Sequence, residues 1–290
     1  MMSKRNHMLS KLAASVIGML GVAATALAQT AIDPNIWRPV AAENLIVISV
    51  DSGDITIELA EDFAPNHVQR MRDLSSSGAL DGKAFYRVID GFVAQGGLNE
   101  ESSETFPNLV NENDQAWSNK GFVPLGNADL FAPEVGHIDG FPIGRNETLG
   151  RQWLLHCPGA LAMARNTDPD TGAADFYVAL GPQRYLDRNL TVFGRVLEGM
   201  EHLQALARGD RDVNSGVLDA IPERNVIRKV TLASTLPIEA QSRWFVMRSN
   251  TQDFEDAKRA RRVRTADFFY RKPPPIIDIC SFTTPAQKLE

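Results

Sequence analysis

The sequence predicts a mainly β protein built on a closed antiparallel barrel of eight strands. Eight short segments combine apolar, β-branched and aromatic residues in the way typical of strands. Most of them follow one another directly along the chain and only two helical patterns separate them, which favours antiparallel pairing over a doubly wound sheet. Closure would also remove exposed strand edges. The eight predicted strands are residues 45–50, 55–59, 85–89, 92–96, 159–163, 176–179, 192–196 and 226–232.

The first two strands are expected to form a hairpin that leads into a helix. Residues 45–50 form a continuous apolar run, residues 51–54 have turn chemistry, and residues 55–59 alternate apolar and polar positions. Pro65 then opens a helix whose apolar residues recur every three to four positions. A second helix is predicted over residues 200–207, between the last two strands. We expect these two helices to cap the barrel.

Two long stretches fall outside the barrel pattern. Residues 98–158 form a long inserted loop that is rich in proline and glycine. Connections of this length are usually functional or folded as small units of their own. Residues 236–290 form a C-terminal extension with a predicted helix over residues 251–264, and a triple proline at residues 273–275 then favours an extended end. The barrel domain is therefore expected to span residues 44–235.

The N-terminus has the features of a cleaved signal peptide. Residues 1–28 combine a positively charged start, an apolar stretch and an Ala-Leu-Ala sequence just before Gln29, which is typical of a cleavage site. No later stretch is long and apolar enough to span a bilayer. We expect a periplasmic or secreted protein in which residues 29–43 lead into the barrel. An uncleaved signal anchor is the alternative, and it would need a longer apolar run.

The charge distribution argues against nucleic acid as the partner. The chain has 30 basic and 36 acidic residues, a net charge of −6, and without residues 1–28 the net charge is −9. Residues 29–235 contribute 17 basic and 29 acidic residues, and an acidic body of this kind repels nucleic acid and anionic membranes. The basic cluster at residues 258–264 is interpreted as the solvated face of a helix or as a segment that docks on the acidic body.

No cofactor, metal or nucleophile site is predicted. The sequence lacks a glycine-rich phosphate loop, a Gly-x-Ser-x-Gly elbow, a His-Glu-x-x-His motif and a paired Cys-x-x-Cys. No two of the four histidines after residue 28 stand at metal-ligand spacing, so each is interpreted as a structural or surface histidine. These histidines are His67, His137, His156 and His202.

One strand–turn–strand unit carries most of the functional information. It reads Phe-Tyr-Arg-Val-Ile-Asp-Gly-Phe-Val-Ala-Gln-Gly-Gly over residues 85–97. Strand alternation puts Arg87 on the same face as Phe85 and Ile89, and the turn brings Gln95 within reach of the arginine. The unit resembles the signature of cyclophilin-type peptidyl-prolyl isomerases.

Further blocks of the sequence support this resemblance. Residues 158–165 together with 175–178 resemble the central strands of the family, and residues 185–200 resemble its penultimate strand and helix. The blocks occur in the family's order and cover residues 44–235 without the inserted loop. The resemblance implies a cyclophilin-like eight-stranded barrel and catalysis of X-Pro isomerisation without a cofactor or metal.

By position, the resemblance assigns roles to eleven residues. It makes Arg87 the catalytic guanidinium, and it makes Gln95 the anchor for that arginine and for the substrate backbone. The nine implied substrate-binding residues are Phe92, Val93, Ala164, Arg165, Asp175, Tyr177, Tyr185, Leu186 and Leu190. Tyr185 stands where tryptophan is common, Leu190 where histidine is common and Asp175 where glutamine is frequent. We therefore expect weak cyclosporin binding.

The residue types suit rotation about a peptide bond, which breaks no covalent bond. Amide resonance sets a barrier of about 18–20 kcal/mol for this rotation. A fixed guanidinium can stabilise the nitrogen of the twisted bond better than that of the planar one. We expect an isomerase that acts on proline-containing unfolded or folding exported polypeptides. The alternative is a non-catalytic periplasmic chaperone or peptide-binding module on the same scaffold, which the long loop and the changes at Asp175 and Leu190 favour.

The chain contains two cysteines, Cys157 and Cys280. In an oxidising compartment an even pair is more often bridged than free, so we expect a disulfide between them. The bridge would fasten the C-terminal extension to the barrel. Two buried free thiols are the alternative.

Overall fold

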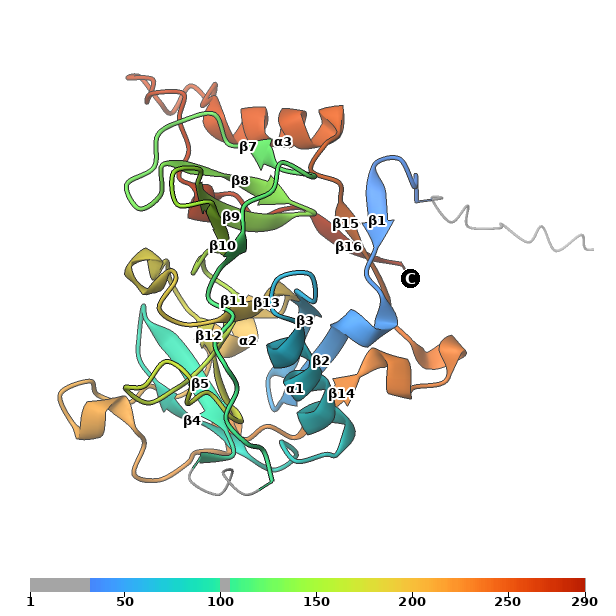
Figure 1. The fold of residues 1–290 in the computed structure, drawn as a ribbon, viewed down its shortest axis with the longest axis vertical. Coiled ribbons are helices and arrows are strands. Elements are labelled where there is room, and N and C mark those ends of the chain that lie inside the picture. The colour runs from blue at the N-terminus through green and yellow to red at the C-terminus, as the bar shows by residue number, and fades with distance from the viewer. Residues whose placement is uncertain (1–31, 100–104, 290) are drawn as a thin grey trace, which may run out of the picture. The chain divides into compact units, whose positions relative to one another are not determined.

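The computed structural model describes residues 32–99 and 105–289, and the predicted signal peptide lies outside these residues. All eight predicted strands are present in one antiparallel sheet (Figure 1). The strand order is β14-β2-β3-β13-β11-β12-β5-β4, so that the hairpins β2–β3, β4–β5 and β11–β12 pair directly. The strands are β2 (Leu45–Val50), β3 (Gly53–Leu59), β4 (Ala84–Val88), β5 (Val93–Gly97), β11 (Ala160–Met163), β12 (Asp175–Ala179), β13 (Val192–Glu198) and β14 (Lys229–Leu232).

The eight-stranded sheet is an open half-barrel, so the prediction of a closed barrel was wrong. Its edge strands are β4 and β14, which do not pair with each other in the described residues. An isolated bridge joins Ala84, the first residue of β4, to Val226, which precedes β14. The last strand begins at Lys229 rather than at Val226 because residues 223–225 form a 3-10 turn. Ile227 then pairs with the loop before β4 instead of extending the strand. Residues 226–227 therefore bond to the start of β4 and the loop before it, in place of a regular ladder between β4 and β14.

Two helices cover the core of this sheet. α1 (Pro65–Ser76) packs against β13 and β14, and α2 (Met200–Gln204) packs against β3. Proline at the first helical position of α1 has no N–H group to leave unpaired. The apolar side of α1 is buried, with Val68, Met71 and Leu74 at most 1% exposed. The predicted positions of both helices are confirmed, although α2 is shorter than expected.

The segment expected as a long inserted loop contains a second antiparallel sheet. Its strand order is β6-β10-β9-β8-β7. The central hairpin, β8–β9, turns at Asp139 and Gly140, which both have positive φ angles, and Asp-Gly is a strong hairpin sequence. The strands are β6 (Gln115–Ala116), β7 (Val123–Pro124), β8 (Glu134–Ile138), β9 (Phe141–Asn146) and β10 (Arg151–Leu154).

The C-terminal extension is folded and incorporates the N-terminal lead-in. β15 (Arg243–Met247) lies between β1 (Trp37–Pro39) and β16 (Ala286–Leu289) in a three-stranded sheet. The predicted helix is present as α3 (Gln252–Arg262), and the Thr251 hydroxyl caps its first turn by accepting from Phe254 N at 3.2 Å. Short 3-10 helices complete the fold: Ala42–Asn44, Arg184–Leu186, Asn214–Gly216, Glu223–Asn225, Ala233–Thr235, Ile238–Ala240 and Ile279–Ser281.

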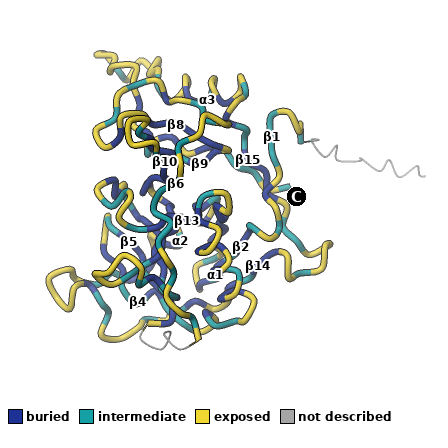
Figure 2. Tube along the Cα trace, in the orientation of Figure 1, coloured by how far each residue is buried: buried dark blue, intermediate teal, exposed yellow. Residues whose placement is uncertain are grey.

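The inserted sheet and the extension form what we call the accessory region, residues 115–154 and 236–289, which has its own hydrophobic core. Leu125, Val135 and Trp153 of the insertion pack there with Phe254 and Ile279 of the extension. Figure 1 shows α3 beside β7 and β8, and Figure 2 shows that the strands of the inserted sheet are largely buried while α3 exposes one side. Segments more than a hundred residues apart therefore share one core.

The basic cluster of the extension docks on the inserted sheet. Lys258 is only 3% exposed, and its ammonium donates to Pro124 O at 3.3 Å. Arg262 donates to the neighbouring carbonyl of Leu125. A disulfide between Cys280 and Cys157, which lies just after β10, joins the extension covalently to the rest of the chain. Each interpretation of the cluster therefore holds in part: Arg259 and Arg261 are exposed, whereas Lys258 and the half-buried Arg262 dock on carbonyls of the inserted sheet, which belongs to the acidic body.

Candidate active site

The predicted catalytic pair lies on the hairpin β4–β5. Arg87 and Gln95 are cross-strand partners, and the arginine Nη1 donates to the amide Oε1 at 3.0 Å. The amide Nε2 donates in turn to the Tyr86 hydroxyl at 2.7 Å. The side chain that was predicted to act and the side chain that was predicted to anchor it are therefore in direct contact.

An irregularity in β4 aims Arg87 at this site. The register of β4 against β5 shifts between Ala84 and Arg87. Phe85 is fully buried in the core of the eight-stranded sheet, whereas Tyr86 and Arg87 both reach the side chain of Gln95. Simple alternation, which put Arg87 on the face of Phe85, was wrong because the extra residue rotates the strand. Such register shifts commonly re-aim a side chain beside a functional site.

A later loop supplies two residues that were not predicted: Ser215, which contacts the arginine, and Arg211, which lies beside Phe92. Arg87 Nε donates to Ser215 O at 2.8 Å, and Ser215 has a positive φ of 53°. The guanidinium of Arg211 lies 5.3 Å from the centre of the Phe92 ring, and that of Arg87 lies 5.7 Å from it. The segment is a polar loop without a recognisable motif, so no local pattern could have placed it here.

Burial shapes the charge state of this cluster. It lowers the pKa of Arg87, and the nearby positive charge of Arg211 acts in the same direction. An arginine nevertheless stays protonated in proteins, so the site holds a fixed positive charge. Burial also raises the pKa of Tyr86 to about 12, helped by the charge of Asp175. The Tyr86 phenol is therefore neutral near pH 7.

Most of the predicted proline-binding side chains gather in one apolar cluster beside Arg87. Val93 and Tyr177 are buried in it, and Phe92, Ala164 and Leu190 pack against it half-buried.

Two predicted pocket residues behave differently. Leu186 is half-buried and is not among the members of this cluster, and Tyr185 is 61% exposed in the 3-10 turn that carries both. The structure thus brings five of the seven apolar and aromatic candidates together.

A polar groove of about 400 Å³ adjoins the cluster. Gln95, Ala164, Arg165 and Asp175 all line it, so these four predicted residues share one surface. Burial raises the pKa of Asp175, although its carboxylate accepts a backbone hydrogen bond from Asn99 at 2.9 Å.

The groove residue Arg165 is held in place by backbone carbonyls. Its Nη2 donates to Asn189 O at 2.7 Å and its Nη1 to Asn166 O at 2.7 Å. A groove of this kind offers hydrogen-bonding groups along the path of an extended peptide.

The rest of the described chain adds two observations. Within residues 32–99 and 105–289, no group of three or more His, Cys, Asp or Glu side chains is arranged to hold a metal ion. No helix in these same residues has the length and apolar character needed to cross a membrane. What the site presents is a half-buried guanidinium next to an apolar cluster and a polar groove.

Comparison with known proteins places this geometry in a family. The sequence matches the family "Cyclophilin type peptidyl-prolyl cis-trans isomerase/CLD" over residues 45–232. A probable peptidyl-prolyl cis-trans isomerase from Brucella suis is 28% identical over 211 residues, which cover 72% of this chain and 89% of that protein. Peptidyl-prolyl cis-trans isomerase B from Bacillus subtilis is 31% identical over 160 residues, which cover 55% of this chain and 87% of that protein.

A solved structure resembles more of the chain than the family match does. The crystal structure of cyclophilin AquaCyp293 from Hirschia baltica has a TM-score of 0.74 and 28% sequence identity, and the match covers 89% of this chain and 95% of that one. This coverage exceeds residues 45–232, so the likeness includes part of the accessory region. Together with the family match, it shows that this chain belongs to the cyclophilin-type peptidyl-prolyl cis-trans isomerases.

Proposed function

We propose that the chain accelerates X-Pro isomerisation in exported polypeptides by donating a hydrogen bond from Arg87 to the nitrogen of the twisted peptide bond. One observation carries this proposal: Arg87 is fixed by Gln95 and Ser215 between the apolar cluster and the polar groove. Within the described residues, Nη2 of Arg87 donates to no acceptor, so it is available to a substrate.

The fixed guanidinium suits the electronic change during rotation. In the planar bond the nitrogen lone pair is delocalised into the carbonyl, whereas twisting localises it on the nitrogen. A donor placed at that nitrogen therefore binds the twisted state more strongly than the planar one, which lowers the barrier. Gln95 and Tyr86 hold the donor in place before the reaction, so little reorganisation is needed during rotation.

The two sides of the site would divide the substrate between them. The proline ring would pack on Phe92, Val93, Tyr177 and Leu190, which desolvates it. The backbone on either side would lie in the polar groove along Ala164 and Arg165. With one side of the bond held by packing and the other by hydrogen bonds, thermal rotation is confined to the peptide bond itself.

The exported location is part of the proposal and rests on the sequence of residues 1–28. The disulfide between Cys157 and Cys280 supports it, because structural disulfides persist in oxidising compartments. Cell fractionation and N-terminal sequencing test this part. A mature protein that begins at Gln29 outside the cytoplasm is expected, and an intact N-terminus on a cytoplasmic protein would contradict it.

A protease-coupled assay on a short X-Pro peptide tests the mechanism. Arg87→Ala should lower kcat/KM by about a hundredfold, or ~2.7 kcal/mol, without unfolding the protein. Arg87→Lys should restore little, because an ammonium lacks the planar fork that binds Gln95, Ser215 and substrate together. Arg259→Ala is the matched control, since Arg259 is an exposed arginine of α3 that is ion-paired with Asp256. Near-normal turnover of a folded Arg87→Ala protein would overturn the role of Arg87.

A further inference from the structure

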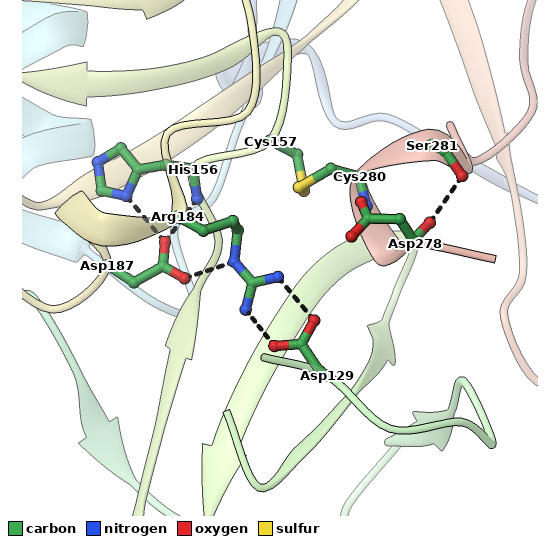
Figure 3. Close-up of a disulfide and its surroundings, with 8 residues drawn as sticks. All are labelled: Asp129, His156, Cys157, Arg184, Asp187, Asp278, Cys280 and Ser281. Atoms are coloured by element: carbon green, nitrogen blue, oxygen red, sulfur yellow. Dashed lines mark hydrogen bonds and ion pairs between the residues drawn. A yellow bond between two sulfur atoms is a disulfide. The ribbon is translucent and has the colours of Figure 1, made fainter. Parts of the chain in front are cut away.

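His156 is fully buried beside the apolar cluster. It contacts Tyr177, a member of that cluster, and Asp187 in the turn that follows Tyr185 and Leu186. Its Nε2 lies 2.9 Å from the Tyr177 hydroxyl, and its Nδ1 lies 3.1 Å from Asp187 Oδ1. Figure 3 shows the His156 ring facing Asp187, with the guanidinium of Arg184 on the other side of that carboxylate. No resemblance to a family motif pointed to this histidine, and it follows the inserted sheet directly in the chain.

The direction of these hydrogen bonds follows from the chemistry of the partners. Asp187 is ion-paired with Arg184 at 2.7 Å, so its carboxylate only accepts hydrogen bonds. Nδ1 of His156 must then carry a proton, and we assign the tautomer with this single ring proton, in which Nε2 is an acceptor. The Tyr177 phenol therefore donates to His156, which satisfies a hydroxyl group in a residue that is only 4% exposed.

The backbone of His156 holds the 183–187 turn, which carries the predicted substrate-binding residues Tyr185 and Leu186. Its N–H donates to Asp187 at 2.9 Å, and its C=O accepts from Gln183 N at 2.8 Å. These two bonds fix both ends of the turn that carries Tyr185 and Leu186. His156 thus connects Tyr177 of β12 to the 183–187 turn.

We propose that His156 is a positioning residue of the isomerase: it holds Tyr177 and the 183–187 turn at a fixed separation and so sets the width of the proline pocket. This inference rests on the proposed function of the site. It predicts that His156 contributes to the binding of proline and not to the rotation step, because Arg87 and Gln95 do not contact it.

Kinetic constants of three variants, measured separately as kcat and KM, test the inference. His156→Leu should raise KM about tenfold with kcat within about twofold of wild type, because it leaves the Tyr177 hydroxyl without a partner and removes the ring donor to Asp187, which keeps Arg184. Tyr177→Phe should raise KM about threefold, since only the hydroxyl is lost. His156→Gln, which keeps one donor and one acceptor, should recover most of the loss.

Coupling between the two residues gives a readout that a general loss of stability would not. In the Tyr177→Phe/His156→Leu double variant no phenol is left unpaired, so KM should be no higher than in His156→Leu alone. KM effects that simply multiply would contradict a direct link. His137→Leu is the matched control: His137 is equally buried, but it lies in the core of the accessory region, and its kinetics should match wild type.

A spectroscopic measurement covers the case in which His156→Leu fails to fold. Long-range ¹H–¹⁵N NMR of the wild type should show His156 protonated at Nδ1 and not at Nε2, and the Nε2 resonance should move in Tyr177→Phe. Protonation at Nε2 in the wild type would overturn the assignment.

The wild-type rate separates the two proposals. An inactive wild type overturns the proposed function, whereas an active wild type with unchanged KM in folded His156→Leu and Tyr177→Phe overturns only the role of His156.

Discussion

The eight-stranded sheet and the accessory region are stabilised in different ways. The sheet contains three hairpins of strands adjacent in sequence, β2–β3, β4–β5 and β11–β12, and long-range pairings such as β3–β13 join them. Its core consists mainly of aliphatic side chains such as Ile48, Ile57 and Leu161. The accessory region packs segments more than a hundred residues apart into one core, and a disulfide ties its extension to Cys157, just after the inserted sheet. Its buried residues include Lys258 and the histidine His137. Local patterns predicted every strand of the first region, whereas in the second region they predicted α3 but none of the strands.

The accessory region also reaches the active site. Asp129 of the insertion binds the guanidinium of Arg184 at 2.9 and 3.0 Å, and Arg184 in turn binds Asp187 beside His156 (Figure 3). The accessory region therefore supplies a buried carboxylate to the turn beside His156, and variants can separate this contribution from the stability of the accessory region itself.

Removal of the disulfide should affect the accessory region most strongly. The bridge closes a loop across a sequence separation of 123 residues, for which loop entropy corresponds to at most about 5 kcal/mol. In Cys157→Ser/Cys280→Ser, hydrogen exchange should therefore accelerate in α3 and the inserted sheet, while β3 and β13 keep their protection. Wild type under reductant is the control and should show the same pattern. Equal loss of protection in both regions would show that they unfold as one unit.

Asp129→Asn should weaken the link between the two regions. Asp129 and Arg184 are both almost fully buried, and the variant leaves Arg184 with Asp187 as its remaining charged partner. Loss of a charge-assisted hydrogen bond should lower the free energy of unfolding by about 2 kcal/mol. Asp278→Asn, at an exposed position of the extension, is the control in a urea titration. Equal unfolding midpoints for wild type and Asp129→Asn would show that the buried pair contributes nothing to stability.

His137 should make the accessory region sensitive to acid. Burial, together with the positive charges of Lys258 and Arg195, lowers the pKa of His137 from 6.5 to about 3. Between these values the unfolded chain binds the extra proton, so the free energy of unfolding falls as the pH falls, by at most about 1.4 kcal/mol per pH unit. Neither ring nitrogen has a hydrogen-bond partner in the described part of the chain.

The variant His137→Leu isolates this contribution from that of the carboxylates. Denaturant unfolding at several pH values should show that, as the pH falls below 6.5, the free energy of unfolding decreases less in the variant than in wild type. Above pH 6.5 the plots of unfolding free energy against pH should run parallel for the two proteins. Parallel curves down to pH 4 would contradict the assignment, because the histidine would then titrate alike in the folded and unfolded chain.

The smallest effect is expected at the rim of the pocket. Tyr185 is largely exposed there, and the resemblance to cyclophilins implies that an indole N–H at this position donates to cyclosporin. Tyr185→Trp should therefore tighten weak cyclosporin inhibition about fivefold, the value of one neutral hydrogen bond of ~1 kcal/mol. Tyr270→Trp, at an exposed tyrosine of the extension, should leave inhibition unchanged. Nanomolar inhibition of the wild type would show that Tyr185 already supplies the missing contact.

Residue patterns predicted the eight strands and the three helices because alternation and helical spacing are local. They failed where distant contacts decide the outcome. The register shift in β4 turned Arg87 to another face, and the 3-10 turn at Glu223–Asn225 shortened the last strand, so that within the described residues β14 forms no ladder with β4. Ser215 and Arg211 reach the site from a loop without a motif. The interpretation of His156 as a structural or surface histidine agrees with its burial, but its link to Tyr177 depends on residues that only the fold brings together.

The central claim is that this cyclophilin twists X-Pro bonds through Arg87. Exchange NMR tests it most directly, because it observes cis–trans interconversion of a proline peptide at equilibrium, without protease. With catalytic amounts of wild type, exchange cross-peaks between the cis and trans signals should appear, and with equal amounts of Arg87→Ala they should be absent or about a hundredfold slower. Shifted peptide signals without exchange cross-peaks in the wild type would contradict the claim and would identify the chain as a peptide-binding module on a cyclophilin scaffold.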